Sequence, residues 1–307
     1  MHVVGTKGKS TAARTLAATL RAEGLRSAAY TSPHVDGWHE RLETDAAGLA
    51  SALDRVRADA EAVGATQFEV LSAAAFVDFA ARGVEAAVVE AGLGGRHDAT
   101  NVVDARVVLL TNIGLEHTDV LGSTREEIAA EKLAVAHAAE TVVLPDREFA
   151  ALVPAGRVRV GGVREAAGAF LGRSVGEVVE VALPGRFERR ADGEVRDGAH
   201  TPEAVDWLLA RLPDPGGYVV VASILGDKDA AGILERLAGA GQTLVATRSS
   251  NARALPAGEV ADRARGLFAR VETVDDPRAA VARARTLGAP VLVTGSLYLL
   301  ADLSREG

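Results

Sequence analysis

The strongest constraint on the fold of this chain is a glycine-rich turn near its start, Gly5-Thr6-Lys7-Gly8-Lys9-Ser10-Thr11, between an apolar run and an alanine-rich segment. A strand-to-helix turn of this kind aims backbone N–H groups and the positive end of a helix dipole at an anion. Lys9 adds a charge for the terminal phosphates, and Ser10 adds a hydroxyl near the metal. Val3 occupies the place of the first glycine of a full Walker A sequence. An ordinary glycine-rich turn is the alternative, but Gly8-Lys9-Ser10 in this context favours phosphate binding.

The rest of the chain alternates short β-branched runs with longer alanine-rich stretches, which predicts an α/β fold with a parallel sheet covered by helices on both faces. The expected strands are His2 to Val4, Ser27 to Thr31, Glu85 to Glu90, Arg106 to Thr111, Thr141 to Leu144, Tyr218 to Ala222, Leu244 to Thr247 and Val291 to Thr294. The expected helices are Ser10 to Glu23, a helix opened by the capping box Ser123-Thr124-Arg125-Glu126 and reaching about His137, Glu203 to Arg211, Ala230 to Ala238, Gly258 to Ala269 and Arg278 to Leu287.

The length of 307 residues allows two domains. The segment from Pro154 to Gly176 is rich in glycine and arginine with weak periodicity, and it is interpreted as the connection between two sheets. The predicted domains are 1–182 and 183–307.

Composition excludes several classes of function. The chain has 34 Lys and Arg against 42 Asp and Glu, a net charge of −8, which leaves no positive excess for nucleic acid. It contains no cysteine, so disulfides and thiolate chemistry are excluded. Neither a charged leader nor an apolar stretch of about 18 residues is present. A cytoplasmic protein without a membrane partner is expected.

Two further segments carry polar residues just past expected strands, where α/β folds bind ligands. Glu90 ends an apolar run and is the first residue of the segment Glu90 to Asn101. A carboxylate at this place beside a phosphate loop would suit Mg²⁺. It could also be a solvated strand end. His117, in Thr111 to Asp119, could be a metal ligand, although on its own a polar loop residue is the favoured interpretation.

Taken together, the motifs resemble folylpolyglutamate synthase and dihydrofolate synthase, within the Mur ligase superfamily. The resemblance runs in order along nearly the whole chain, through Gly5 to Ser10, Tyr30 to His34, Glu40 to Leu42, Glu90 to Asn101, Thr111 to His117, Glu131-Lys132, Leu183 to Glu188, Asp197 to Pro202, Asp227 to Asp229, Arg253 to Pro256 and Thr294 to Tyr298. It implies a Mur-ligase-like central ATPase domain with a parallel sheet and a smaller Rossmann-like C-terminal domain.

The resemblance also implies an activity. An acid would react with ATP to give an acyl phosphate, which an amino acid would then attack, and closure of two domains would exclude water. The expected cofactors are ATP and Mg²⁺, the substrates are small molecules, and a monomer is expected. Glutamate added to folate or a folate-like acid is the first candidate reaction, in one-carbon metabolism.

Individual positions are implied by the same resemblance. Nucleotide contacts would come from Gly5, Thr6, Lys7, Gly8, Lys9, Ser10, Thr11, Arg186 and Asp197. Metal ligands would be Ser32, Glu90 and His117, and the catalytic residues would be Lys9, Lys132 and His200. Lys132 matches a lysine that is carbamylated in these ligases, whereas a solvated lysine on an amphipathic helix is the alternative. Asp197 follows a polar run that composition alone would assign to a turn.

The substrate is less constrained than the reaction. The chain starts directly at the phosphate loop, whereas the folate enzymes carry a helical segment before it that contributes to the pterin side. The sequence Gly8-Lys9-Ser10 is closer to that of the muramyl ligases than to that of the folate enzymes. The segment that holds adenine in the family is not recognisable around Gly161 to Ala169. Aromatic walls for a flat pterin are few, namely Trp38, Phe68 and Phe76, so weak folate binding is expected. A ligase for another acid, such as a peptide or polyglutamate chain, and a non-catalytic nucleotide-binding module remain alternatives.

Overall fold

The computed structural model describes residues 1–35 and 37–304. The chain divides into two compact units, Met1–Val181 and Ala182–Gly307, one residue from the boundary expected at Leu183. Each unit contains its own six-stranded sheet, and the predicted α/β class is confirmed. Within the described residues, no helix combines the length and the apolar character needed to cross a lipid bilayer.

The first unit is built on an entirely parallel sheet with the strand order β2-β3-β1-β4-β5-β6. Its strands are β1 (His2–Val4), β2 (Ser27–Tyr30), β3 (Ala86–Glu90), β4 (Val107–Leu110), β5 (Thr141–Leu144) and β6 (Val158–Val160). Its helices are α1 (Lys9–Ala22), α2 (Ala46–Val63), α3 (Gln67–Ala81), α4 (Thr118–Leu121), α5 (Arg125–Leu133) and α6 (Val163–Leu171), with the 3₁₀ turns η1 (Trp38–Leu42), η2 (Ala99–Val102), η3 (Ala134–Ala136) and η4 (Ala150–Leu152).

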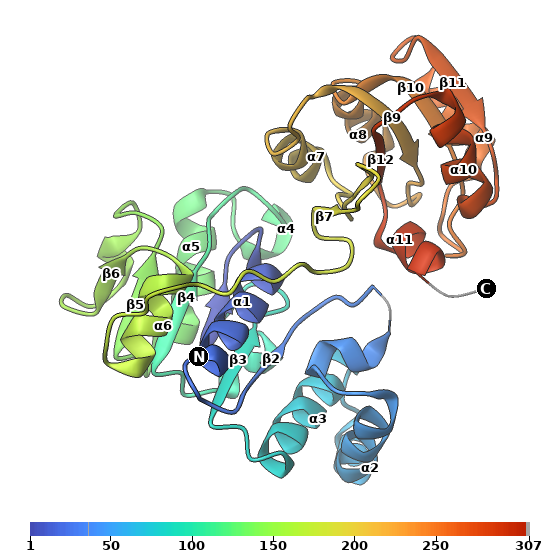
Figure 1. Ribbon diagram of the computed structural model, residues 1–307. Helices are drawn as coiled ribbons and strands as arrows, with labels where there is room; N and C mark the ends of the chain where they lie inside the picture. Colours follow the sequence, from blue (N-terminus) through green and yellow to red (C-terminus); the bar gives the residue numbers. More distant parts are fainter. Residues whose placement is uncertain (36, 305–307) are drawn as a thin grey trace. The chain divides into compact units, whose positions relative to one another are not determined.

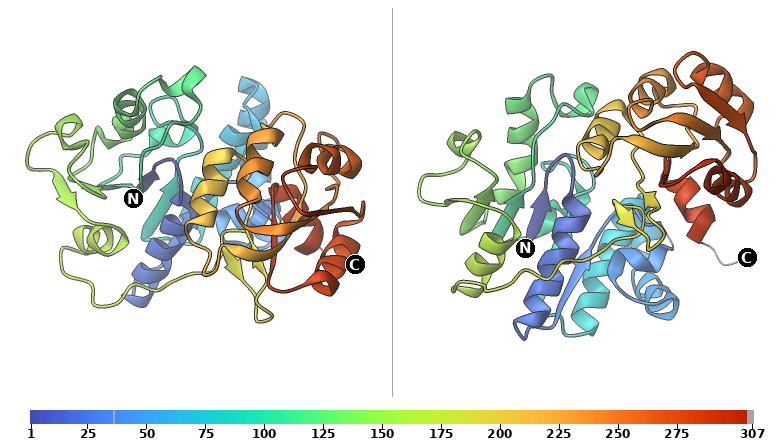
Figure 2. Two further views of the ribbon diagram at one scale, coloured as in Figure 1. Left: turned by 90° about the horizontal axis from the view of Figure 1, so that it is seen from above. Right: turned by 45° about the horizontal axis from the view of Figure 1, so that its top comes forward.

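Alternation along these strands places neighbouring side chains on opposite faces of the sheet. Val3 packs in a core cluster with the apolar faces of α1 and α6, and these two helices contact each other (Figures 1 and 2). Val4 packs in a second cluster with Ile128 and Leu133 of α5. The inner strands β3, β4 and β5 are buried on both faces and are therefore mainly apolar runs, whereas the edge strand β6 is Val-Arg-Val and largely exposed. β1 lies between β3 and β4, so the loop after β1 leaves the middle of the sheet.

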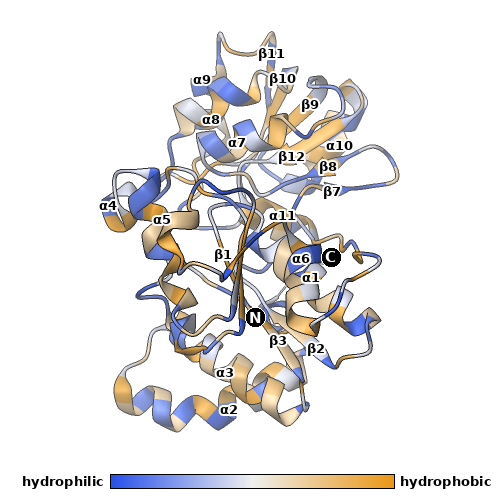
Figure 3. Cartoon of the chain, turned by 90° about the vertical axis from the view of Figure 1, so that its left-hand side faces the viewer, coloured by the Kyte–Doolittle hydropathy of each residue, from blue (hydrophilic) through white to orange (hydrophobic). Residues whose placement is uncertain are grey.

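The second unit has the strand order β11-β10-β9-β12-β8-β7, parallel except for the edge hairpin of β7 and β8. Its strands are β7 (Glu188–Arg189), β8 (Val195–Arg196), β9 (Gly216–Ala222), β10 (Gly241–Ala246), β11 (Arg270–Thr273) and β12 (Val291–Thr294). Its helices are α7 (Pro202–Leu209), α8 (Ala230–Leu237), α9 (Ala257–Ala264), α10 (Pro277–Leu287) and α11 (Leu297–Ser304). Its main core joins β9 and β10 to α7, α8 and α9. Figure 3 shows β9 and β10 as mostly hydrophobic.

Two expected helices end early, since α5 ends at Leu133 rather than near His137 and α9 ends at Ala264 rather than at Ala269. Two further sequence-based expectations are wrong. The supposed connection from Pro154 to Gly176 contains β6 and α6, so the irregular link between the units lies further along, over 172–187. The capping box at Ser123 is displaced by one residue: Thr124 is the N-cap, and Glu127 bonds back to it. Two adjacent hydroxyl residues followed by two adjacent glutamates made both registers possible.

A buried histidine gives the first unit a specific pH dependence. His2 is fully buried, and this burial is the largest of the effects that lower its pKa from 6.5 to about 4. Between pH 6.5 and about 4, His2 therefore binds a proton in the unfolded chain but not in the folded chain. The free energy of unfolding consequently falls as the pH falls through this window. His2→Gln should flatten the pH dependence by at most about 3 kcal/mol. Urea unfolding from pH 7.5 to 4.5 checks this, and parallel curves for the two proteins would contradict it.

Candidate active site

The loop between β1 and α1 has a backbone that demands glycine at two positions. Gly8 is the left-handed N-cap of α1, with φ 78°. Gly5 has φ 144°, and a Cβ on it would lie 2.0 Å from the Thr111 hydroxyl oxygen. The loop therefore packs directly on the segment that follows β4. Thr11 is exposed on the first turn of α1, whereas Ser10 is buried.

The segment after β4 holds the loop by hydrogen bonds at several atoms. The Lys7 N–H donates to the Asn112 side-chain oxygen at 2.9 Å, and the Asn112 amide donates back to the Lys7 carbonyl at 2.9 Å. Thr111 donates to the same carbonyl at 2.7 Å. Thr6 N–H donates to the Asn112 carbonyl at 3.0 Å. The sequence predicts a functional residue in this segment only at His117 and predicts no role for Asn112. The position of Asn112, a polar residue just after an expected strand, is the feature that could have indicated its role.

The carbonyl of Gly5 is the point at which two predicted catalytic residues meet. Lys9 Nζ donates to it at 2.9 Å, and Lys132 Nζ donates to it at 3.1 Å. Lys132 is 1% exposed and also pairs with Glu116 at 2.8 Å. The interpretation of Lys132 as a solvated lysine is therefore wrong. Burial lowers the pKa of the Lys132 amine, Glu116 raises it, and the charges of Lys9 and Lys7 lower it.

Glu90 lies at the carboxyl end of β3 and is 2% exposed. One oxygen of its carboxylate accepts a hydrogen bond from the Ser10 hydroxyl at 3.0 Å, and the other accepts from the Ser32 N–H at 2.9 Å. The Ser10 hydroxyl oxygen also lies 3.3 Å from the Ser32 carbonyl oxygen. This arrangement brings Ser10, Ser32 and Glu90 together beside the loop, with hydroxyl, carbonyl and carboxylate oxygens of the kind that Mg²⁺ prefers.

His117 has a different setting. It is exposed, it is the N-cap of α4 with φ 48°, and its carbonyl accepts the first bonds of that helix. Across residues 1–35 and 37–304, no group of three or more His, Cys, Asp or Glu side chains is placed to hold a metal ion. The candidate metal site therefore contains one carboxylate and otherwise neutral oxygens, and the assignment of His117 stays a prediction.

In the second unit, three predicted residues lie on one short stretch around β7 and β8. Asp197 is buried, and its carboxylate accepts from the Phe187 N–H at 2.8 Å and the Ala199 N–H at 2.9 Å. Burial raises the pKa of this carboxyl, while these bonds and the charge of Arg186 oppose the rise. His200 Nδ1 lies 2.7 Å from the Gly198 carbonyl. Asp197 thus fixes the turn that carries Arg186, and it is no surface turn residue.

A pocket of about 350 Å³ opens beside the loop after β3. Its apolar lining includes Phe68, Leu93 and Leu121, and its polar lining includes Asp98 and Glu131. Phe68 thus lies in the wall of a pocket, where a side chain that contacts a flat ligand would have to lie. The other two aromatic candidates do not line this pocket. Trp38 contacts His34 with tilted rings whose centroids are 4.2 Å apart, and Phe76 packs in the cluster formed with α2 and α3.

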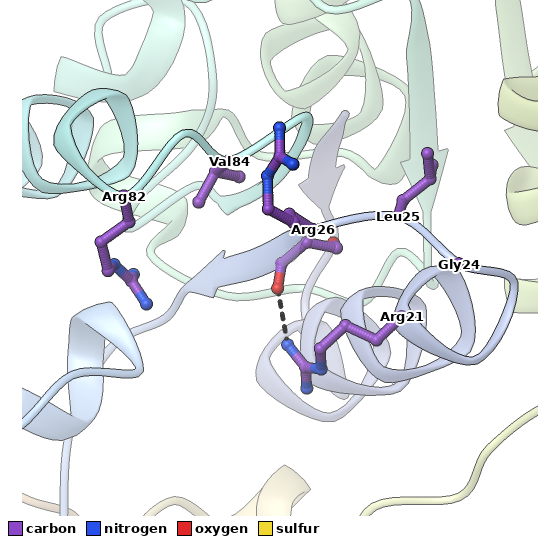
Figure 4. A pocket seen from close by; sticks show the side chains of 7 residues that line it. Arg21, Gly24, Leu25, Arg26, Arg82 and Val84 are labelled. Carbon is purple, nitrogen blue, oxygen red and sulfur yellow. Dashed lines mark hydrogen bonds between the residues drawn. The ribbon is translucent and has the colours of Figure 1, made fainter.

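A second pocket, of about 450 Å³, lies at the amino end of β2, the opposite end of the sheet from the phosphate loop. Arg21, Arg26 and Arg82 line it (Figure 4). Each guanidinium has a carboxylate partner, in Glu43, Glu85 and Asp78 respectively. Arg21 also donates to the Ser27 carbonyl at 2.8 Å. Since these charges are balanced, the pocket gives no reason to place an anionic ligand there.

Comparison with protein families agrees with this arrangement. Residues 3–155 match the Mur ligase middle domain, and residues 185–297 match the glutamate ligase domain of Mur ligases. The fold and the phosphate-loop site thus define a Mur-type ligase architecture.

Individual relatives narrow the class. The probable bifunctional folylpolyglutamate synthase/dihydropteroate synthase of Halobacterium salinarum is 35% identical over 68% of this chain, and the match spans only 26% of that relative. The structure of Escherichia coli FolC in complex with DHPP and ADP superposes with a TM-score of 0.85 at 26% identity, covering 98% of this chain and 86% of that one.

A third comparison is the structure of a bifunctional folylpolyglutamate synthase/dihydrofolate synthase with Mn, AMPPNP and L-glutamate bound. It superposes with a TM-score of 0.77 at 28% identity and covers 98% of this chain and 87% of its own. The chain belongs to the folylpolyglutamate synthase and dihydrofolate synthase family of the Mur ligase superfamily, a family of ATP-dependent ligases.

Close packing at Gly95 gives a test of the site's construction. A Cβ on Gly95 would lie 2.5 Å from the Lys132 carbonyl oxygen and 2.8 Å from that of Glu131. Because both obstacles are backbone atoms, Gly95→Ala should lower the free energy of unfolding by about 1–3 kcal/mol. Gly176→Ala is the matched control, since its Cβ would meet nothing within 4 Å. Urea unfolding compares the two, and equal stability would show that α5 does not lie against this loop.

Proposed function

We propose that this chain is an ATP-dependent, ADP-forming ligase that converts a carboxylic acid to an acyl phosphate and couples it to an amino acid. The first candidate reaction is the addition of glutamate to folate or a folate-like acid. The observation that carries the proposal is the convergence of the phosphate loop, two lysines and the Ser10–Ser32–Glu90 group at the carboxyl ends of adjacent parallel strands.

The nucleotide would bind to the backbone of Gly5–Thr11, at the N-terminus of α1. Oxygens of Ser10, Ser32 and Glu90 fit Mg²⁺, and His117 is a further proposed ligand. When bound, the ion would neutralise negative charge on the phosphate oxygens. In the second unit, Arg186 and Asp197 are the proposed nucleotide contacts, and His200 is a proposed catalytic residue.

The proposed reaction has two steps, in which the acyl phosphate forms and is then converted to the amide. The carboxylate of the acid attacks the γ-phosphorus in line, ADP leaves, and the amine then attacks the acyl carbon and releases phosphate. Lys9 currently donates to its own loop, at Gly5 and Thr6, and it would exchange these carbonyls for the phosphates. We propose carbamylation for Lys132, because the reaction with CO₂ needs the neutral amine and burial lowers this pKa.

The pocket lined by Phe68 and Leu93 is the proposed site of the acid. It lies at the same end of the sheet as Glu90, since Leu93 follows β3 by three residues. One aromatic wall is modest support for a flat ring, which favours weak binding of folates. A non-folate acid, such as a peptide or polyglutamate chain, is therefore the second candidate.

The remaining alternative is a nucleotide-binding module without turnover. The buried Lys132 and the Ser32–Glu90 pair argue against it, because nucleotide binding alone does not need them. The predicted cytoplasmic location, monomeric state and place in one-carbon metabolism stay predictions.

The experiment that tests the function measures ADP formation with Mg²⁺ while acids and amino acids are varied. Dihydropteroate, tetrahydrofolate and a glutamyl peptide are the acids, each with and without glutamate. Acid-dependent and amine-dependent ADP formation is expected for at least one pair. Nucleotide binding without acid-dependent turnover for any pair would favour the non-catalytic module.

Removal of the loop lysine should abolish turnover. Lys9→Ala is expected to lower kcat/KM by at least about 100-fold, the loss seen when one preorganised charge-stabilising group is removed from a site. Thermal unfolding should change little, because among the described residues the hydrogen bonds of this side chain go to the carbonyls of its own loop. Arg55→Ala, on the exposed surface of α2, removes the same charge as a control. An active Lys9→Ala enzyme would contradict the phosphate-loop assignment.

Metal dependence should separate Glu90 from ordinary carboxylates. Glu90→Gln, and also His117→Ala, should raise the Mg²⁺ concentration for half-maximal activity by about tenfold or more, since each removes one of few protein ligands. Glu85→Gln, at the exposed start of the same strand, should leave it unchanged. An unchanged Mg²⁺ titration for either variant removes that residue from the metal site.

A further inference from the structure

A chain of buried polar groups crosses the first unit behind the active site. It starts at His2 of β1, whose side chain is fully buried. His2 Nε2 lies 2.8 Å from the hydroxyl oxygen of Thr100, in η2, which is also fully buried. Neither residue touches the loop, the two lysines or the Ser10–Ser32–Glu90 group through a hydrogen bond that the structure shows, so the proposed reaction leaves them unexplained.

The direction of each proton follows from counting donors. The Thr100 hydroxyl also bonds to Asp98 Oδ1, and an ionised carboxylate can only accept. The single hydroxyl proton therefore goes to Asp98, and His2 must donate its Nε2–H to Thr100. Because burial lowers the pKa of His2 to about 4, the ring is neutral near pH 7 and carries its single N–H on Nε2. Its Nδ1 carries only a lone pair, which explains why this buried atom can lack a hydrogen-bond partner.

Asp98 passes the connection to the loop after Glu90. Its Oδ1 also accepts from the Thr100 N–H at 3.0 Å, and its Oδ2 accepts from the N–H groups of Gly92 at 3.0 Å and Leu93 at 2.9 Å. Among the described residues, no Lys, Arg or His forms an ion pair with this carboxylate. Among the described residues, the hydrogen-bond donors to Asp98 are all neutral. Loss of one donor should therefore weaken the remaining hydrogen bonds of this carboxylate.

The two anchored amides determine one wall of the proposed acid pocket. Leu93 lines that pocket directly, together with Phe68 and Asp98. Gly92 lies so close to the ring of Phe68 that a Cβ would be 2.6 Å from its nearest atom. The position of the Gly92–Leu93 turn therefore sets the separation of Phe68 and Leu93.

We propose that His2 and Thr100 are positioning residues, which act through Asp98 to hold the Gly92–Leu93 turn in the shape that receives the acid substrate. The role in substrate binding rests on the proposed function, whereas the anchoring of the turn does not. Neither residue touches the reacting atoms.

The test uses two substitutions at Thr100 that differ in the hydroxyl. Thr100→Val keeps the branched shape and removes the hydroxyl, and Thr100→Ser keeps the hydroxyl and removes the methyl group. Hydrogen–deuterium exchange of the peptide over Glu90–Arg96 should be about tenfold faster in Thr100→Val and near the wild-type rate in Thr100→Ser. Unchanged exchange in Thr100→Val, or equally faster exchange throughout the first unit, would overturn the proposal.

Kinetics then test the link to the substrate. With the acid that supports ADP formation, Thr100→Val should raise KM for the acid about tenfold while KM for ATP and kcat stay near wild type. A merely structural role would instead lower activity without this split. If no acid supports turnover, the proposed function fails, but the exchange measurement still decides the anchoring.

A second pair protects the test against a folding failure. His2→Leu removes the donor, and His2→Gln restores an N–H near the place of Nε2. His2→Leu should reproduce the faster exchange of Glu90–Arg96, and His2→Gln should rescue it. Failure of this rescue in a folded His2→Gln protein, with exchange as fast as in His2→Leu, would contradict the relay from β1.

Discussion

The structure of the first unit depends on the contact between the phosphate loop and the segment that follows β4. Gly5 lies where any side chain would collide with Thr111, and the backbone of Thr6 and Lys7 is paired with Asn112. This contact is possible because β1 and β4 are adjacent parallel strands that end at the same edge of the sheet. It leaves the Gly5 carbonyl facing Lys9 and Lys132, and it brings Ser10 to Glu90.

Two lysines sharing one carbonyl would repel each other in a buried site without compensation. Glu116 supplies one negative charge at Lys132, and the Gly5 carbonyl supplies dipoles to both ammonium groups. At Lys9 the arrangement suits an anion with several charges, such as a triphosphate, because its oxygens would replace the Gly5 and Thr6 carbonyls that this ammonium group contacts. The same logic makes Lys132 unusual among lysines, since burial favours its neutral form.

Much of this could be predicted from the sequence, for identifiable reasons. The central strands of both sheets are short, mainly apolar runs, and β1, β5 and β12 begin and end where the sequence predicts. Glu90 was recognisable because it ends such a run. The sequence predicts the capping box one residue too early, because Ser123 offers the same hydroxyl as Thr124. β6 and α6 were missed because glycines and arginines obscure their periodicity, although Ala166 and Ala167 are fully buried.

The polar contacts could not be predicted in the same way. Neither the pairing of Asn112 with Lys7 nor that of His2 with Thr100 leaves a local signal, because each joins residues about 100 positions apart.

The central claim is that the acid is activated by phosphate transfer from ATP, and the transfer of a labelled oxygen atom from the acid to phosphate tests it most directly. With an acid labelled with ¹⁸O in its carboxylate, ATP, Mg²⁺ and the amine, the account predicts one ¹⁸O atom in each phosphate released, because the bridging oxygen of the acyl phosphate leaves with phosphorus. Unlabelled phosphate, formed in step with the amide product, would contradict it.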